Sequence, residues 1–146
     1  MEIVAKLTIA EVFEGQSFSF DAVLAENMID AFSVLTGDIS PLHMDRDFAR
    51  QRGFNDRVVH GVLLGGLVSR LVGVHLPGRD CLLHSMTMKY LAPVYAGETV
   101  RVTGTVEQVS IAAKAMTVQV SILNLMSNAM AAKGKATVGF TDANPE

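Results

Sequence analysis

Hydrophobic and polar residues alternate along four segments in the second half of the chain, at residues 82–90, 100–107, 116–122 and 130–140. In the first segment, the apolar side chains expected on one face are Leu82, Met86, Met88 and Tyr90. Residues 17–24 alternate in the same way around Phe18 and Phe20. Alternation with a single apolar face is typical of an antiparallel sheet that buries one face. The pattern therefore predicts such a sheet, built from five strands.

Between these segments, in the first half of the chain, the apolar positions recur with a helical period. Asn27 is the expected cap of a helix that Gly37 closes, because glycine readily adopts the left-handed conformation at a helix end. Residues 38–43 are then expected to form a loop. Asp45 is expected to cap a second, short helix that ends before Gly53.

A third helix is predicted in the apolar stretch from residue 58 to residue 76. This stretch contains four polar or charged side chains, His60, Ser69, Arg70 and His75. A membrane span of about 20 residues rarely carries so many, so we expect a helix buried in protein and no membrane association. The sheet and this helix together predict an α+β fold, in which a curved antiparallel sheet wraps around a central apolar helix.

Composition narrows the class of protein. The 146 residues are 49% hydrophobic and contain no repeat or flexible linker, so one domain spanning residues 1–146 is expected. A formal net charge of -3 without a basic stripe argues against nucleic acid as a partner. The first ten residues do not resemble a signal peptide, and Cys81 is the only cysteine. We therefore expect a cytoplasmic protein without a disulfide or a multi-cysteine metal cluster.

The segment Asp38-Ile39-Ser40-Pro41-Leu42-His43 is the first candidate for chemistry. It places a carboxylate and an imidazole five residues apart in a loop that proline stiffens. Such a pair can hold a water molecule and move its protons. The alternative is a surface loop in which Asp38 caps a turn and His43 has no role.

The second candidate is Val58-Val59-His60-Gly61, which opens the apolar helix. Unpaired amides at a helix start can stabilise an oxygen that gains negative charge, and glycine lets a ligand approach the Gly61 amide. Alternatively, the glycine only permits close packing. His60 either orients the entry loop or is a hydrogen-bonded structural histidine. Ser69, two turns along the helix, needs a hydrogen-bond partner, which its own helix can supply.

Together these residues resemble the MaoC-like, (R)-specific enoyl-CoA hydratases. The shared features, in chain order, are Thr36-Gly37-Asp38-x-x-Pro41-x-His43 with Asp45, Phe54, Val58-Val59-His60-Gly61, Ser69, Leu76-Pro77-Gly78 and Leu91-Ala92-Pro93-Val94. The resemblance implies a hot-dog fold, a homodimer with active sites near the subunit interface, and an acyl thioester substrate carried by coenzyme A or acyl carrier protein. It also implies that Asp38 and His43 are catalytic, that the Gly61 amide binds the oxyanion, and that Ser69 lies near the site. Ser40 departs from the family, which usually has asparagine there.

The function that this resemblance implies is reversible hydration of a trans-2-enoyl thioester, without a metal or redox cofactor. Three alternatives stay open. The first is a dehydratase of carrier-protein-bound 3-hydroxyacyl chains, and the second is a hot-dog thioesterase. The third is a non-catalytic subunit that binds acyl thioesters, because the shorter side chain of Ser40 can hold Asp38 less firmly than an amide.

Overall fold

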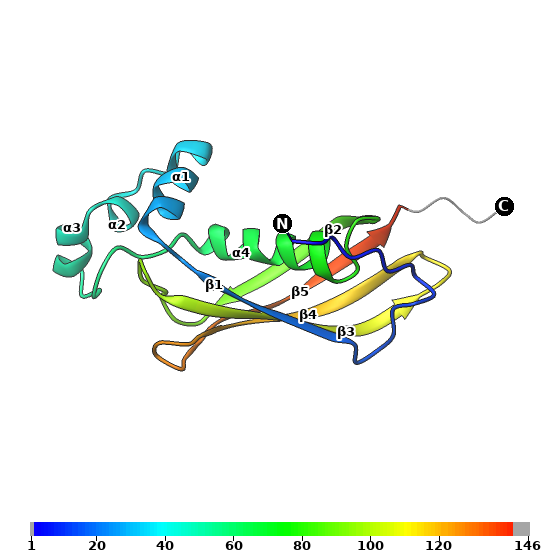
Figure 1. Cartoon of the computed structure of the whole chain (residues 1–146). Coiled ribbons are helices and arrows are strands. Elements are labelled where there is room, and N and C mark those ends of the chain that lie inside the picture. Colours follow the sequence, from blue (N-terminus) through cyan, green and yellow to red (C-terminus); the bar gives the residue numbers. More distant parts are fainter. Residues whose placement is uncertain (1, 142–146) are drawn as a thin grey trace.

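Five antiparallel strands form one curved sheet in residues 2–141, which the computed structural model describes (Figure 1). The strands are β1 (Ser17–Val23), β2 (Cys81–Tyr90), β3 (Thr99–Ser110), β4 (Ala115–Asn124) and β5 (Met130–Phe140). Their order across the sheet is β1-β3-β4-β5-β2, and each neighbouring pair is antiparallel. The five predicted strands are therefore confirmed, and β1 and β2 form the two edges.

The apolar helix lies along the inner face of this sheet (Figure 1). It begins as α4 (Gly61–Arg70) and continues as a π-helical segment, η1 (Leu71–His75). The core between helix and sheet consists of buried aliphatic side chains that include Leu64, Leu67, Val68, Leu71, Val100, Val102, Val106, Met116, Val118, Val120 and Ile122. Burial of one such side chain stabilises the fold by about 1.5–3 kcal/mol. The predicted arrangement, a sheet wrapped around an apolar helix, is confirmed.

One predicted strand face is wrong at its beginning. Leu82 is 56% exposed, whereas Leu83 packs against the core. The pairing of β2 with β5 shifts register between Leu83 and Ser85. One extra residue in a strand reverses the faces on either side of it, so Leu82 lies on the face opposite Met86 and Met88.

The first predicted helix is α1 (Glu26–Thr36). Gly37 ends it with a φ of 78°, and its N–H donates to the carbonyl of Ser33, as predicted. The predicted cap is wrong: Ala25 is the N-cap residue, no side chain caps this end, and Asn27 lies inside the first turn.

Two short helices follow, α2 (Pro41–Met44) and α3 (Arg46–Gln51). The predicted loop is therefore shorter than residues 38–43, because Pro41 starts a helix. The fixed φ of proline suits the first position of a helix, where its missing N–H is not needed. The predicted cap of the next helix is confirmed, since the Asp45 carboxylate accepts from the amides of Asp47 and Phe48 at 2.9 and 3.0 Å.

These three helices gather at one end of the molecule, close to the start of α4 (Figure 1). No helix within the described residues has the length and apolar character needed to cross a membrane. The arrangement places residues 37–44 beside the amino-terminal end of the central helix, where both sequence candidates for chemistry meet.

Candidate active site

The carboxylate and imidazole of the first candidate segment face each other. Asp38 follows the glycine that ends α1, and His43 lies on α2. Asp38 Oδ2 lies 3.9 Å from Nε2 of His43, with the Asp38 side chain 49% exposed and the His43 side chain 15% exposed. The fold therefore gives this pair access to solvent on the Asp38 side and packs the imidazole against protein.

A backbone carbonyl determines which nitrogen of His43 carries the proton. Nδ1 of His43 lies 2.6 Å from the carbonyl oxygen of Val58. A carbonyl can only accept a hydrogen bond, so Nδ1 carries the hydrogen and donates it. In the neutral ring, Nε2 is then an acceptor that faces Asp38. Both facing atoms of the pair can accordingly accept a proton.

His60 lies behind this pair and is almost fully buried, at 1% exposure. Its ring stacks on that of His43 with the centroids 3.9 Å apart. Nε2 of His60 lies 3.1 Å from the backbone carbonyl oxygen of Asp38 and 3.2 Å from the Ser33 hydroxyl oxygen. The sequence allowed His60 to be either a residue that orients the entry loop or a hydrogen-bonded structural histidine. The contacts show both features, because the buried, hydrogen-bonded ring holds the loop that carries Asp38.

Ser40 supports Asp38 through its backbone. The Ser40 amide donates to Oδ1 of Asp38 at 3.2 Å, and the Asp38 amide donates to the Thr36 hydroxyl at 3.2 Å. The Ser40 side chain makes no cap bond to α2. The loop around Asp38 is thus held by backbone donors and by His60, so a side-chain amide at position 40 is not the only means of fixing it.

Gly61 is the first residue of α4 and lines a cleft of about 400 Å³ together with His43. The other lining residues are Val58, Val59, Leu64, Tyr90, Leu91, Ala92, Pro93 and Val94. The Tyr90 ring covers Gly61 so closely that a Cβ atom there would lie 3.1 Å from two ring carbons. Partial burial raises the pKa of the Tyr90 phenol, which therefore stays neutral. The cleft is thus mostly apolar, and its polar features are the imidazole, the Tyr90 phenol and a helix amino terminus.

Ser69 is the one sequence candidate that the fold does not bring to this place. It is exposed on α4, eight residues beyond Gly61, or about 12 Å along the helix axis at 1.5 Å per residue. Its hydroxyl has no hydrogen bond to any other described residue. Ser69 is not among the residues that line the cleft, so a role for it in the reaction remains a prediction.

Two supporting residues escaped the sequence analysis. Arg57, although charged, is 8% exposed; it donates to the carbonyl of His43 at 2.6 Å and to Asp30 at 2.5 Å. Ser33 is buried in α1 beside His60. The sequence shows only that Arg57 directly precedes an apolar run. That position does not predict its contact with His43.

The sequence of this chain matches one family of known proteins. The model of the MaoC like domain matches residues 8–128. The chain belongs to the MaoC-like domain family. An (R)-specific enoyl-CoA hydratase of Rhodospirillum rubrum is 36% identical over 96 residues, which are 66% of this MaoC-like chain and 67% of that relative. A 3-hydroxybutyryl-CoA dehydratase of Methylorubrum extorquens is 33% identical over 64% of this chain, and a mitochondrial 3-hydroxyacyl-[acyl-carrier-protein] dehydratase of Arabidopsis thaliana is 32% identical over 66%. The matched regions span only 55% and 56% of these last two relatives.

Two solved structures have a similar fold. The (R)-hydratase from A. caviae involved in PHA biosynthesis superposes with a TM-score of 0.84 and 29% identity, over 88% of this chain and 97% of that one. An R-hydratase from Pseudomonas aeruginosa superposes with a TM-score of 0.88 and 24% identity, over 96% and 89% of the two chains. The fold of the MaoC-like chain is therefore the hot-dog fold, as predicted.

Proposed function

We propose that this MaoC-like protein is an (R)-specific enoyl-thioester hydratase. It adds water reversibly to a trans-2-enoyl thioester and so forms the (R)-3-hydroxyacyl thioester. The observation that carries the proposal is the Asp38–His43 pair, whose facing atoms lie 3.9 Å apart beside the start of α4. The names of the relatives, which are hydratases and dehydratases, support the same hydro-lyase chemistry.

A water molecule between Asp38 and His43 would meet two hydrogen-bond acceptors. Atoms 3.9 Å apart can both lie about 2.8 Å from one water oxygen. That water donates one hydrogen to the carboxylate and the other to Nε2, since the Val58 carbonyl keeps the proton on Nδ1. The lone pairs of the water then point away from the pair, toward the carbon atom that is attacked.

In the proposed reaction, the water oxygen bonds to C3 of the acyl chain while the π bond between C2 and C3 breaks. The Asp38–His43 pair takes one proton from the water and then delivers that proton to C2, so that both side chains return to their starting protonation. Both new bonds form on one face of the double bond, which gives syn addition. Negative charge develops meanwhile on the thioester oxygen, where the Gly61 amide would donate a hydrogen bond.

This chemistry needs no metal or redox cofactor, because the pair itself activates the water. Coenzyme A or the phosphopantetheine of acyl carrier protein enters only as part of the substrate. A dehydratase of carrier-protein-bound 3-hydroxyacyl chains is the second candidate, and the Arabidopsis relative supports it. Rates on the coenzyme A ester and the carrier-protein ester of one acyl chain separate the two candidates.

We also propose a homodimer and a cytoplasmic location. β2 is an edge strand, so one side of its backbone has no strand partner among the described residues, and edge strands of this kind favour pairing with another strand. Two copies joined along β2 would continue the sheet across both. Light scattering that gives twice the mass of one chain supports the dimer, and the mass of one chain contradicts it.

The first test of the proposed reaction is to add crotonyl-CoA and follow the absorbance of its conjugated double bond. Loss of absorbance without release of free thiol supports the hydratase. Release of thiol identifies a thioesterase instead. Tight binding without turnover on either coenzyme A or carrier-protein substrates identifies a non-catalytic acyl-binding subunit and contradicts the proposal.

A further inference from the structure

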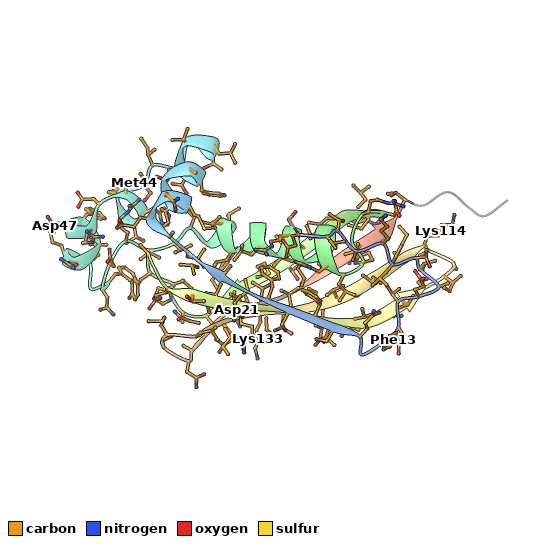
Figure 2. The ribbon with its side chains drawn as sticks, in the orientation of Figure 1. Phe13, Asp21, Met44, Asp47, Lys114 and Lys133 are labelled. Atoms are coloured by element: carbon orange, nitrogen blue, oxygen red, sulfur yellow. The ribbon has the colours of Figure 1, made fainter. Side chains whose placement is uncertain are left out.

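The outer face of the sheet, which points away from α4, carries a groove that the proposed hydration does not use. The groove has a volume of about 680 Å³. Its walls are two neighbouring rows of outward side chains that cross the strands. From β2 to β4, one row is Lys89, Lys133 and Ser121, and the other is Thr87, Lys135 and Gln119. Figure 2 shows Lys133 on the side of the sheet opposite α4.

Two of these lysines lie directly opposite each other. Lys89 of β2 pairs with Lys133 of β5 in the register of the sheet, and both side chains are exposed. Neither has an ion pair or hydrogen bond through its side chain to another described residue. Like charges opposite each other on neighbouring strands destabilise a sheet, so an anion placed between these ammonium groups would remove an unfavourable interaction.

The remaining charges on this face are already paired. Arg101 binds Asp21 at 2.8 Å, and Lys135 binds Glu107 at 2.9 Å. The unpaired positive charge is therefore confined to one end of the groove, although the whole chain has a net charge of -3. A local excess of positive charge on a chain with a negative net charge favours the binding of an anion at that place.

The lining around the two lysines suits phosphate oxygens. No acidic side chain is found among the residues that line the groove. Ser121 lies opposite Lys133 on the neighbouring strand, so the same row also offers a hydroxyl donor beside Lys133. Ammonium and hydroxyl donors together are typical partners of phosphate, and a volume of about 680 Å³ lies within the range of sites for small organic molecules.

We propose that this groove binds an organic phosphate of about the size of a nucleotide, with its phosphate group between Lys89 and Lys133. The site is separate from the cleft around His43 and Gly61, because it lies on the other face of the sheet. Two sources share the required chemistry: the nucleotide end of coenzyme A and a free nucleotide.

Calorimetric titration with ADP at low salt tests the proposal on the whole protein. We expect ADP to bind, and the double variant Lys89→Gln with Lys133→Gln to weaken binding about tenfold or more, since contacts to charged groups are lost. The same double variant should unfold at an equal or higher temperature, because the repulsion is removed. Lys6→Gln, an exposed lysine outside the groove, is the matched control and should bind ADP like the unchanged protein.

Absence of ADP binding, or equal binding by the double variant, would overturn the proposal. Competition tests the source: displacement of ADP by coenzyme A shows that the nucleotide end of coenzyme A fits this groove, whereas coenzyme A that binds without displacing ADP excludes that end and leaves a free nucleotide. The measurement needs no turnover, and Asp38→Asn should bind ADP unchanged. Failure of the hydratase assay and failure of this proposal are therefore distinguishable.

Discussion

Replacing Gly61 by alanine separates the packing role of this glycine from its role beside the substrate. The added methyl group would lie 3.1, 3.1 and 3.3 Å from three carbons of the Tyr90 ring, where carbon atoms prefer about 3.5–4.0 Å. The ring must therefore move by a few tenths of an ångström. Tyr90 is 48% exposed, so it has room to do so.

The expected change in stability is small for this reason. The close contact costs roughly 1–2 kcal/mol, and the better helix propensity of alanine offsets up to about 1 kcal/mol of it. The methyl group nevertheless stands beside the amide that would bind the thioester oxygen. Alanine keeps the backbone N–H, but its methyl group would hold the thioester oxygen out of hydrogen-bond reach of that donor. We therefore expect the hydration rate to fall about 100-fold or more, the range for loss of one oxyanion hydrogen bond.

Thermal unfolding and the crotonyl-CoA assay, performed on the same preparation, measure both effects. Gly66→Ala is the matched control, because a Cβ atom there meets nothing within 4 Å; it should gain about 0.5–1 kcal/mol in stability and keep full activity. A folded Gly61→Ala protein with undiminished activity would refute the claim that the substrate must approach residue 61 more closely than a methyl group allows. An unfolded one would refute the reasoning about Tyr90.

Three further predictions follow from single contacts. Asp45→Ala removes the carboxylate that accepts from two amides at the start of α3 and should lower the free energy of unfolding by about 1 kcal/mol in denaturant titrations; an unchanged midpoint would contradict this. The Arg101 guanidinium donates to Asp21 and lowers the pKa of that carboxyl. The contribution of this ion pair to the stability of the fold is therefore fully present above the ordinary aspartate pKa, and it is lost as pH falls through the lowered pKa. The melting temperature of Asp21→Asn should accordingly depend less on pH, between neutrality and about pH 3, than that of the unchanged protein. Dialysis against a chelator should leave the hydration rate unchanged, because the proposed mechanism uses no metal. Donor atoms of Asp38, His43 and His60 lie within 4.8 Å of one another, so activity restored only by added metal would contradict this mechanism.

The sequence predicted the strands and the central helix well, because burial of one face imposes a period that can be read from residue types alone. Its errors lie where local geometry departs from that period. Leu82 was placed on the wrong face because the register shift after Leu83 leaves no mark in the pattern. Asn27 is a good cap by type, but the helix begins one residue before it, at Glu26.

The site was predicted in part. The linked motifs identified Asp38, His43 and Gly61, and the fold places His43 and Gly61 in one cleft and Asp38 next to His43. The hydrogen bonds that organise them could not be predicted, because they join positions far apart in the chain. The bond from His43 to the Val58 carbonyl spans 15 residues, and that from Arg57 to Asp30 spans 27. Such contacts depend on how α1, α2 and the start of α4 pack together.

The most direct test of the central claim compares hydration of crotonyl-CoA by the unchanged protein and by Asp38→Asn, with the configuration of the product determined. Because Asp38 is half exposed, the substitution should leave the unfolding temperature nearly unchanged. We predict (R)-3-hydroxybutyryl-CoA from the unchanged protein and almost no product from the folded variant. An (S) product, or equal rates for the two proteins, would contradict the account of the Asp38–His43 pair.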